Sequence, residues 1–93
     1  MSEDDRLKRR TLRWLHYAQE DLSTAQALVN VTTAPARNAC LHAQQSAEKA
    51  IKAILIFLDL RVPRSHDLSG IALLLPDDWE CKHRFTDLAE LAR

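Results

Sequence analysis

The apolar residues of this chain recur at three- and four-residue steps, the periodicity of helices that bury one face. The clearest case is the segment from Ala39 to Leu58, which has no glycine or proline and consists mostly of good helix formers. Glu48 and Lys52 lie away from its apolar side, so we expect them to face water as an i,i+4 ion pair. The apolar stripe comprises Ala43, Ala47, Ala50, Ile51, Ile54 and Leu58.

Two long helices are predicted in the first two thirds of the chain. The first begins between Ser2 and Asp5, where acidic side chains complement a helix N-terminus, and runs to about Asn30. The second runs from about Ala36 to Leu60, with Thr32 or Thr33 as its cap and Pro35 at an early helical position. The inward positions of the first helix are Leu7, Trp14, Leu15, Ala18, Leu22, Ala25, Leu28 and Val29.

Two shorter helices are predicted beyond the break at 61–67. Ser65 or Asp67 caps the third, which Pro76 closes, and Asp77 or Asp78 caps the fourth. Their inward positions are Leu68, Ile71, Leu74 and Leu75 in the third, and Trp79, Phe85, Leu88, Ala89 and Ala92 in the fourth. No segment alternates with period two over the length of a strand. The pattern therefore predicts one all-α domain over residues 1–93, an antiparallel up-and-down bundle of four to five helices.

The composition excludes several function classes. Thirteen basic and thirteen acidic residues balance, so no global field favours nucleic acid or an anionic membrane. The single glycine, Gly70, rules out glycine-rich phosphate loops. The longest apolar run, Ala53 to Leu58, is too short to span a membrane, and the N-terminus lacks the apolar segment of a secretory signal. We therefore expect a cytoplasmic protein without a membrane anchor.

The ligand-bearing residues do not form a metal site in the sequence. Cys40 and Cys81 stand far apart without the close spacing that metal ligands need, and the acidic residues show no paired arrangement. Cys40 is expected to be a small core residue with a reduced thiol. We expect no metal and no cofactor.

Two polar spots remain as candidate sites. His42 lies at the edge of its helix, and it shares that edge with Ala39, Ser46, Lys49 and Ala53. This edge is open to three interpretations: an interface with a second subunit, the wall of a polar cleft, or a half-exposed histidine without further role. His66 follows Arg64 in a loop directly before a helix start, which favours an anion, although a purely structural role in the turn is equally consistent.

Three groups of residues, in this order and spacing, resemble the HEPN domain (higher eukaryotes and prokaryotes nucleotide-binding). The resemblance covers about Trp14 to Leu75, most of the chain. The groups are Trp14-Leu15 with Ala18, Glu20-Asp21-Leu22 and Ala25; Cys40-Leu41-His42-Ala43-Gln44-Gln45 with Ala47-Glu48-Lys49-Ala50 and Lys52-Ala53; and Pro63-Arg64-Ser65-His66-Asp67-Leu68.

The resemblance implies a helical bundle that usually dimerises. Such domains often form a toxin–antitoxin pair with a small nucleotidyltransferase-fold protein, which this chain, with one glycine, does not itself contain. Some members are ribonucleases that use an Arg followed after four to six residues by a His. Others bind nucleotides or act as non-catalytic interaction modules.

Three functional hypotheses follow from the residues and the resemblance together. The first is a homodimeric module that binds a nucleotide or a nucleotidyltransferase-fold partner, with Lys49, Lys52, Arg64 and His66 on the phosphate side. The second is a metal-independent ribonuclease that uses Arg37 and His42 for acid–base and phosphate chemistry on RNA. Arg61 with His66 and Arg10 with His16 fit the same spacing, so the motif has low specificity. The third is a purely structural dimerisation bundle.

Overall fold

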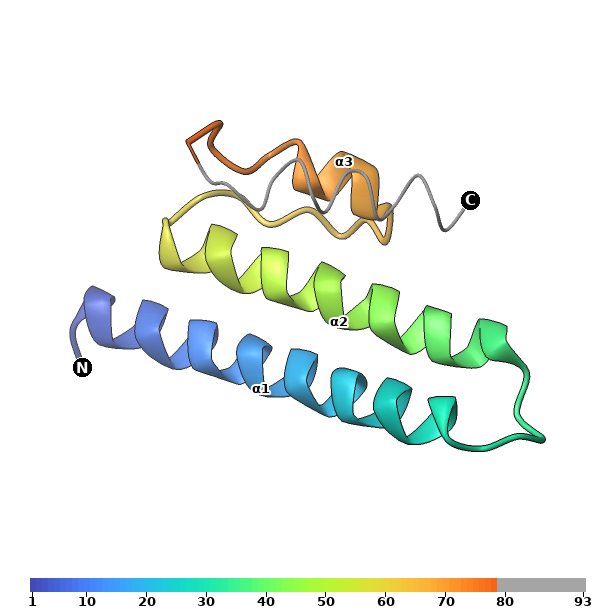
Figure 1. Ribbon diagram of the computed structural model, residues 1–93. Helices are drawn as coiled ribbons and strands as arrows, with labels where there is room; N and C mark the ends of the chain where they lie inside the picture. The colour runs from blue at the N-terminus through green and yellow to red at the C-terminus, as the bar shows by residue number, and fades with distance from the viewer. Residues whose placement is uncertain (79–93) are drawn as a thin grey trace.

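The computed structural model describes residues 1–78 of the chain. This part contains helices α1 (Glu3–Val29), α2 (Ala36–Phe57) and α3 (Leu68–Ala72), and it contains no strand. α1 and α2 run antiparallel, and α3 packs on the side of α2 that faces away from α1 (Figure 1). The predicted all-helical fold is confirmed for these residues. The fourth predicted helix, with Cys81, lies outside the described residues except at its first positions.

The ends of α1 follow the sequence prediction. Ser2 is the N-cap, and its hydroxyl accepts a hydrogen bond from the backbone N–H of Asp5 at 3.2 Å. Three acidic side chains occupy the first turn, where they interact favourably with the helix dipole. The helix ends at Val29 with Asn30 as its C-cap. Both ends are thus set by local chemistry.

The start of α2 differs from the prediction. Pro35 itself is the N-cap, with φ −60° and ψ 137°, and no side chain caps the helix. The prediction that Thr32 or Thr33 caps α2 is therefore wrong. Proline has the N-cap geometry because its ring fixes φ near this value, and its missing N–H removes one donor that would otherwise need a partner.

The end of α2 comes three residues before the predicted Leu60. Asp59 adopts φ 55°, the left-handed conformation that stops a helix. The backbone N–H of Leu60 then bonds the carbonyl of Leu55 at 2.8 Å, and the N–H of Asp59 bonds that of Ile56 at 2.9 Å. These two bonds are the Schellman arrangement, which satisfies carbonyls at the helix end.

The contact face of α1 is narrower than predicted. Its buried and half-buried positions alternate at steps of four and three, as in the seam of a coiled coil. Leu15, Leu22 and Val29, predicted to point inward, are exposed instead. α1 contacts α2 along one seam, and these residues lie on its flank. The seam consists of Leu7, Thr11, Trp14, Ala18, Asp21, Ala25 and Leu28.

The apolar core of the described residues lies between α2 and α3. It comprises Ala47, Ile51, Leu55, Leu68, Ile71, Ala72 and Leu75. Leu74, predicted to be inward, is exposed. α3 ends at Ala72, and the turn bonds from Leu74 to Ile71 and from Leu75 to Ala72 bring Leu75 back to the core. Cys40 is exposed, so its predicted place in the core is also wrong. No described helix has the length and apolar character needed to cross a membrane.

Candidate functional site

The small-residue edge of α2 packs against α1 of the same chain. Ala39 and Ala53 are buried in this contact, and the hydroxyl of Ser46 donates a hydrogen bond to the backbone carbonyl of Ala18 at 2.7 Å. Small side chains allow the two helices to approach closely enough for this bond. This packing contradicts the interpretation of the edge as a second-subunit interface. The His42 side chain is 34% exposed, which agrees with the half-exposed histidine, and the cleft wall stays a prediction.

A first polar cluster, the Asp21 cluster, consists of Asp21 of α1 with His42 and Lys49 of α2. The Lys49 ammonium donates to Asp21 Oδ2 at 2.5 Å, and His42 Nδ1 lies 3.6 Å from Asp21 Oδ1. His42 Nδ1 is buried and has no hydrogen-bond partner among residues 1–78. The carboxylate thus draws both α2 side chains toward α1. Lys49, predicted on the phosphate side, already has an anion as its partner.

Arg37, the other residue of the proposed ribonuclease pair, does not join this cluster. It lies exposed in the first turn of α2, five residues before His42. Five residues correspond to about 140° around a helix axis, so the two side chains leave α2 on different faces. His42 faces α1, and Arg37 faces elsewhere. The described contact of the His42 side chain is with Asp21, and no contact joins it to Arg37 among the described residues.

A second polar cluster, the Glu48 cluster, consists of Glu48 and Lys52 of α2 with His66 of the loop before α3. Glu48 Oε1 accepts a hydrogen bond from the Lys52 ammonium at 3.1 Å and lies 2.7 Å from His66 Nδ1. The Lys52 nitrogen also lies 5.7 Å from the centre of the Trp14 ring, within the range of a cation–π contact.

The burial of this cluster corrects the sequence interpretation. Glu48 is 6% exposed and Lys52 is 4% exposed, although both were expected to face water. The i,i+4 ion pair does form, but it is buried where α1 and the loop before α3 cover α2. Each charge is therefore stabilised by the other and not by water. Lys52, predicted on the phosphate side, can reach a ligand only if it gives up Glu48.

His66 and Arg64 are the accessible members of the predicted phosphate site. The His66 side chain is 86% exposed, although its Nδ1 is bonded to a carboxylate that is 7% exposed. Arg64, two residues earlier in the same loop, is exposed and forms no ion pair with a described residue. The Ser65 hydroxyl accepts a hydrogen bond from the backbone N–H of Asp67 at 2.9 Å. This bond spans His66 and tightens the loop directly before α3.

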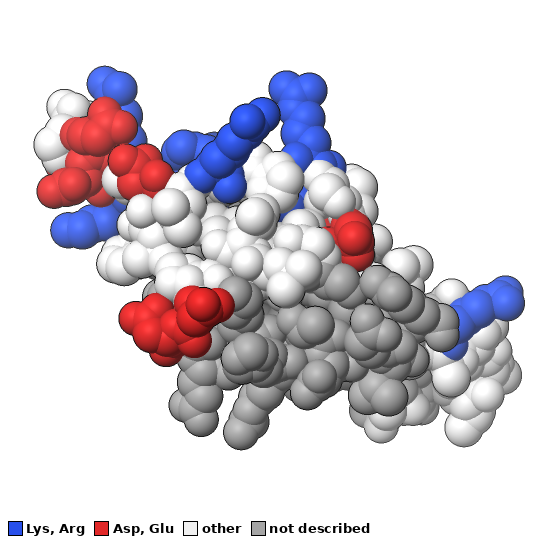
Figure 2. All heavy atoms as spheres, turned by 90° about the horizontal axis from the view of Figure 1, so that it is seen from above, with Lys and Arg blue, Asp and Glu red and all other residues white. Residues whose placement is uncertain are grey.

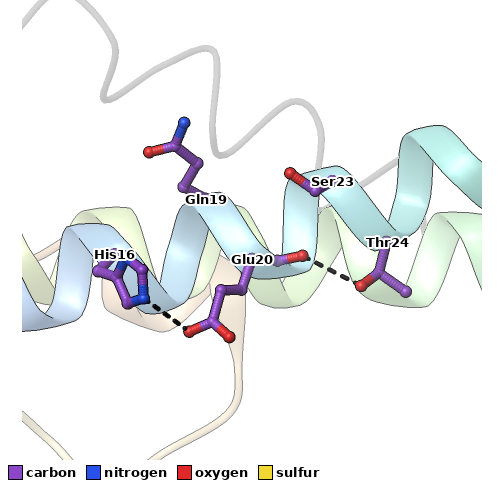
Figure 3. A pocket seen from close by; sticks show the side chains of 5 residues that line it. All are labelled: His16, Gln19, Glu20, Ser23 and Thr24. Carbon is purple, nitrogen blue, oxygen red and sulfur yellow. Dashed lines mark hydrogen bonds and ion pairs between the residues drawn. The ribbon is translucent and has the colours of Figure 1, made fainter.

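A surface hollow of about 500 Å³ lies apart from both clusters (Figure 3). The described residues that line it are all on the exposed side of α1, and none belongs to the predicted sites: His16, Gln19, Glu20, Ser23 and Thr24. Within it, His16 Nε2 lies 3.3 Å from Glu20 Oε1, and the Thr24 hydroxyl donates to the Glu20 carbonyl at 3.1 Å. Three of the five lining side chains, those of His16, Glu20 and Thr24, thus bond one another or the backbone of α1.

The face of the molecule seen in Figure 2 carries charged side chains of both signs. Figure 2 shows basic and acidic side chains interspersed on the face seen there, in keeping with the balanced composition. Among residues 1–78, no three histidine, cysteine or acidic side chains are grouped so that they could hold a metal ion. Recognition at the candidate site therefore depends on local groups.

Sequence reasoning found the histidines and missed the groups that hold them. Asp21, Glu48 and Trp14 provide the partners of the two clusters, and none was proposed as part of a site. The available signal was the seam of α1, because Trp14 and Asp21 occupy its four-and-three spacing. Glu48 could be recognised as a partner of His66 only from the arrangement of the other segments around α2.

A comparison with models of protein families shows which family the chain resembles. The model of the HEPN domain matches residues 11–93, which include both clusters and all three described helices except the first turns of α1. Comparisons with curated proteins and with solved structures find no significant match. The family match covers most of the sequence and agrees with the helical architecture, and the chain therefore belongs to the HEPN domain family.

Proposed function

We propose that this HEPN domain binds the phosphate group of a nucleotide through the loop that carries Arg64 and His66. The observation that carries the proposal is the bond of 2.7 Å between His66 Nδ1 and the buried Glu48 carboxylate. This bond fixes one side of the imidazole and leaves the rest of the ring exposed. An imidazole held in this way and still accessible, with an exposed arginine two residues earlier in the same loop, is suited to a phosphate group.

The four predicted phosphate-side residues contribute unequally to this proposal. Arg64 and His66 reach solvent, whereas Lys49 is paired with Asp21 and Lys52 with Glu48. Lys49 is partly exposed, so it can add long-range attraction without contact. Lys52 acts indirectly, because its charge stabilises the buried Glu48 carboxylate that contacts His66. The direct contacts of the proposal therefore belong to Arg64 and His66.

The arrangement of Arg37 and His42 favours a binding module over a ribonuclease that uses this pair. Acid–base catalysis needs both groups near one phosphodiester, and α2 directs them to different faces. The His42 ring is oriented toward Asp21 of α1. The ribonuclease alternative then requires a second copy of the chain to supply the missing group.

We propose further that the domain acts as a homodimer with a separate nucleotidyltransferase-fold protein, as a toxin–antitoxin-type pair. The support is the family membership and an exposed apolar row on α1, in which Leu15, Leu22 and Val29 recur every seven residues. A search of the neighbouring genes for a nucleotidyltransferase tests the partner. A neighbourhood without such a gene contradicts this part of the proposal.

The nucleotide proposal is tested by binding of AMP, ATP and GMP, measured by calorimetry and thermal shift. We expect Arg64→Gln and His66→Ala each to weaken binding about tenfold or more, because a charge-assisted hydrogen bond contributes about 1.5–3 kcal/mol. His16→Ala is the matched control, because His16 is an exposed histidine that also lies beside a carboxylate. This control should bind as the wild type does.

The same proteins, together with His42→Ala, distinguish the ribonuclease alternative. RNA is incubated with each variant in the presence of a chelator. RNA cleavage that His42→Ala abolishes and His66→Ala leaves intact would contradict the binding proposal. Equal nucleotide affinity of the wild type and His66→Ala would contradict it independently.

A further inference from the structure

Glu48 engages Lys52 and His66 through one oxygen atom. Oε1 accepts from the Lys52 ammonium at 3.1 Å and lies 2.7 Å from His66 Nδ1. Lys52 is 4% exposed and Glu48 is 6% exposed, so water does not compete for this oxygen as it would at the surface. The shared oxygen joins the core of the helix pair to an exposed loop.

The chemistry of this oxygen determines where the proton of His66 lies. A carboxylate paired with an ammonium ion is ionised and offers only acceptors. His66 Nδ1 must therefore carry the hydrogen of the 2.7 Å bond. In the neutral ring, Nε2 is then the unprotonated nitrogen. Nε2 gains a hydrogen only when the ring is charged, and it then donates to an anion.

We propose that Glu48 is a positioning residue, which holds His66 by Nδ1–H so that Nε2 is the ligand-facing atom. This rests on the proposed function, and it narrows the ligand group to a phosphate that accepts a hydrogen bond from the imidazolium Nε2–H. Arg64, exposed in the same loop, supplies a second set of donors to the phosphate. A carboxylate that orients a histidine in this way fixes both its tautomer and its ring direction.

Lys52 and Trp14 make this role possible for a buried acid. An isolated buried carboxylate is strongly unfavourable, and Lys52 provides the opposite charge. The Trp14 ring, 5.7 Å from the Lys52 nitrogen, in turn stabilises the ammonium from the side of α1. The position of His66 thus depends on contacts from α1, α2 and the loop before α3.

Two variants separate positioning from folding. Glu48→Gln keeps one acceptor oxygen, which the Lys52 ammonium should still orient because it only donates. The neutral amide leaves the buried Lys52 without a counter-charge, so urea denaturation of this variant is measured first and its other readouts are taken where it is folded. The double variant Glu48→Leu with Lys52→Met removes the acceptor for Nδ1–H. It leaves no unpaired charge, because it replaces the buried ion pair by apolar side chains of similar size.

The first readout is nitrogen NMR of the His66 ring in the free protein, in alkaline buffer where imidazoles are neutral. We expect Nδ1 to be protonated in the wild type and in Glu48→Gln. The double variant should shift toward the tautomer mixture of a free histidine. A wild-type His66 protonated at Nε2, or unchanged in the double variant, overturns the proposal.

The second readout is the affinity for AMP, with adenosine as the control lacking phosphate. We expect the affinity of the double variant for AMP to fall about tenfold or more, the same loss that we expect for His66→Ala. Glu48→Gln should retain most of the affinity. Equal affinity of the double variant and the wild type overturns the positioning role. If the wild type binds no AMP, the proposed function fails, and the tautomer measurement still decides whether Glu48 holds the ring.

Discussion

Lys52 shows how strongly the surroundings of a residue determine its role. Lysine is seldom buried unless paired, and this one is 4% exposed. It is stabilised by Glu48 one turn earlier and by the face of Trp14. A buried pair of this kind adds little net stability compared with apolar residues, but removing one partner leaves a charge in the interior.

Lys52→Met is therefore expected to destabilise the protein by about 3–5 kcal/mol, because Glu48 loses its buried counter-charge and keeps only the exposed His66. Urea denaturation measures the change. The double variant Glu48→Leu with Lys52→Met should recover most of the loss. A single variant as stable as the wild type would contradict the buried pair.

At the level of elements, α2 is the helix on which both clusters depend, and its C-terminal end sets where the site loop begins. Asp59 adopts φ 55° there, a conformation that costs a non-glycine residue roughly 1 kcal/mol. Its two neighbouring turn bonds keep it in place. The loop that leaves this turn carries Arg64 and His66 back across α2 to Glu48.

Asp59→Gly should stabilise the protein by about 0.5–1 kcal/mol, because glycine adopts the left-handed conformation without steric strain. The matched control is Asp4→Gly in the first turn of α1, where the backbone is helical. Glycine should cost about 0.5–1 kcal/mol there, through its lower helix propensity together with the lost attraction of the carboxylate to the helix dipole. Thermal unfolding of both variants measures the two opposite shifts. A loss of stability in Asp59→Gly would show that the aspartate side chain itself supports the turn.

At the level of the whole molecule, the described chain has one apolar core and a separate seam between α1 and α2, in which apolar and small residues enclose an ion pair. The core lies between α2 and α3, whereas α1 meets α2 through small residues and ion pairs. Leu15 and Leu22 are left exposed on the flank of α1. This distribution supports the proposal of a homodimer, because a second copy would bury the exposed leucines.

Leu22→Glu is expected to convert such a dimer to a monomer, since the interface would have to bury an unpaired carboxylate. Sedimentation velocity measures the state at matched concentrations. Thr24→Glu is the control, because Thr24 is an exposed polar position of the same helix. A wild type that sediments as a monomer at all concentrations would contradict the dimer.

The local features of the fold could be predicted from the sequence. α1 begins at Glu3, within the predicted range from Ser2 to Asp5, and the breaks around Pro35 and Pro63 separate the helices where predicted. Helical periodicity, capping and proline geometry act over a few residues, so one chain displays them directly. The HEPN resemblance rests on motifs of the same local kind, and the family match confirms it. His42 and His66 were also found as polar spots from their local settings.

The partners of these residues were decided only by the tertiary structure. Helical periodicity cannot say how many neighbours surround α2, so Glu48 and Lys52 were assigned to water and Leu15 and Leu22 to the interior. Contacts between α1 and α2, and between α2 and the loop before α3, reverse both assignments. Whether a charged side chain is solvated or buried depends on segments distant in sequence. Here the loop before α3 places His66 in contact with the buried Glu48 carboxylate.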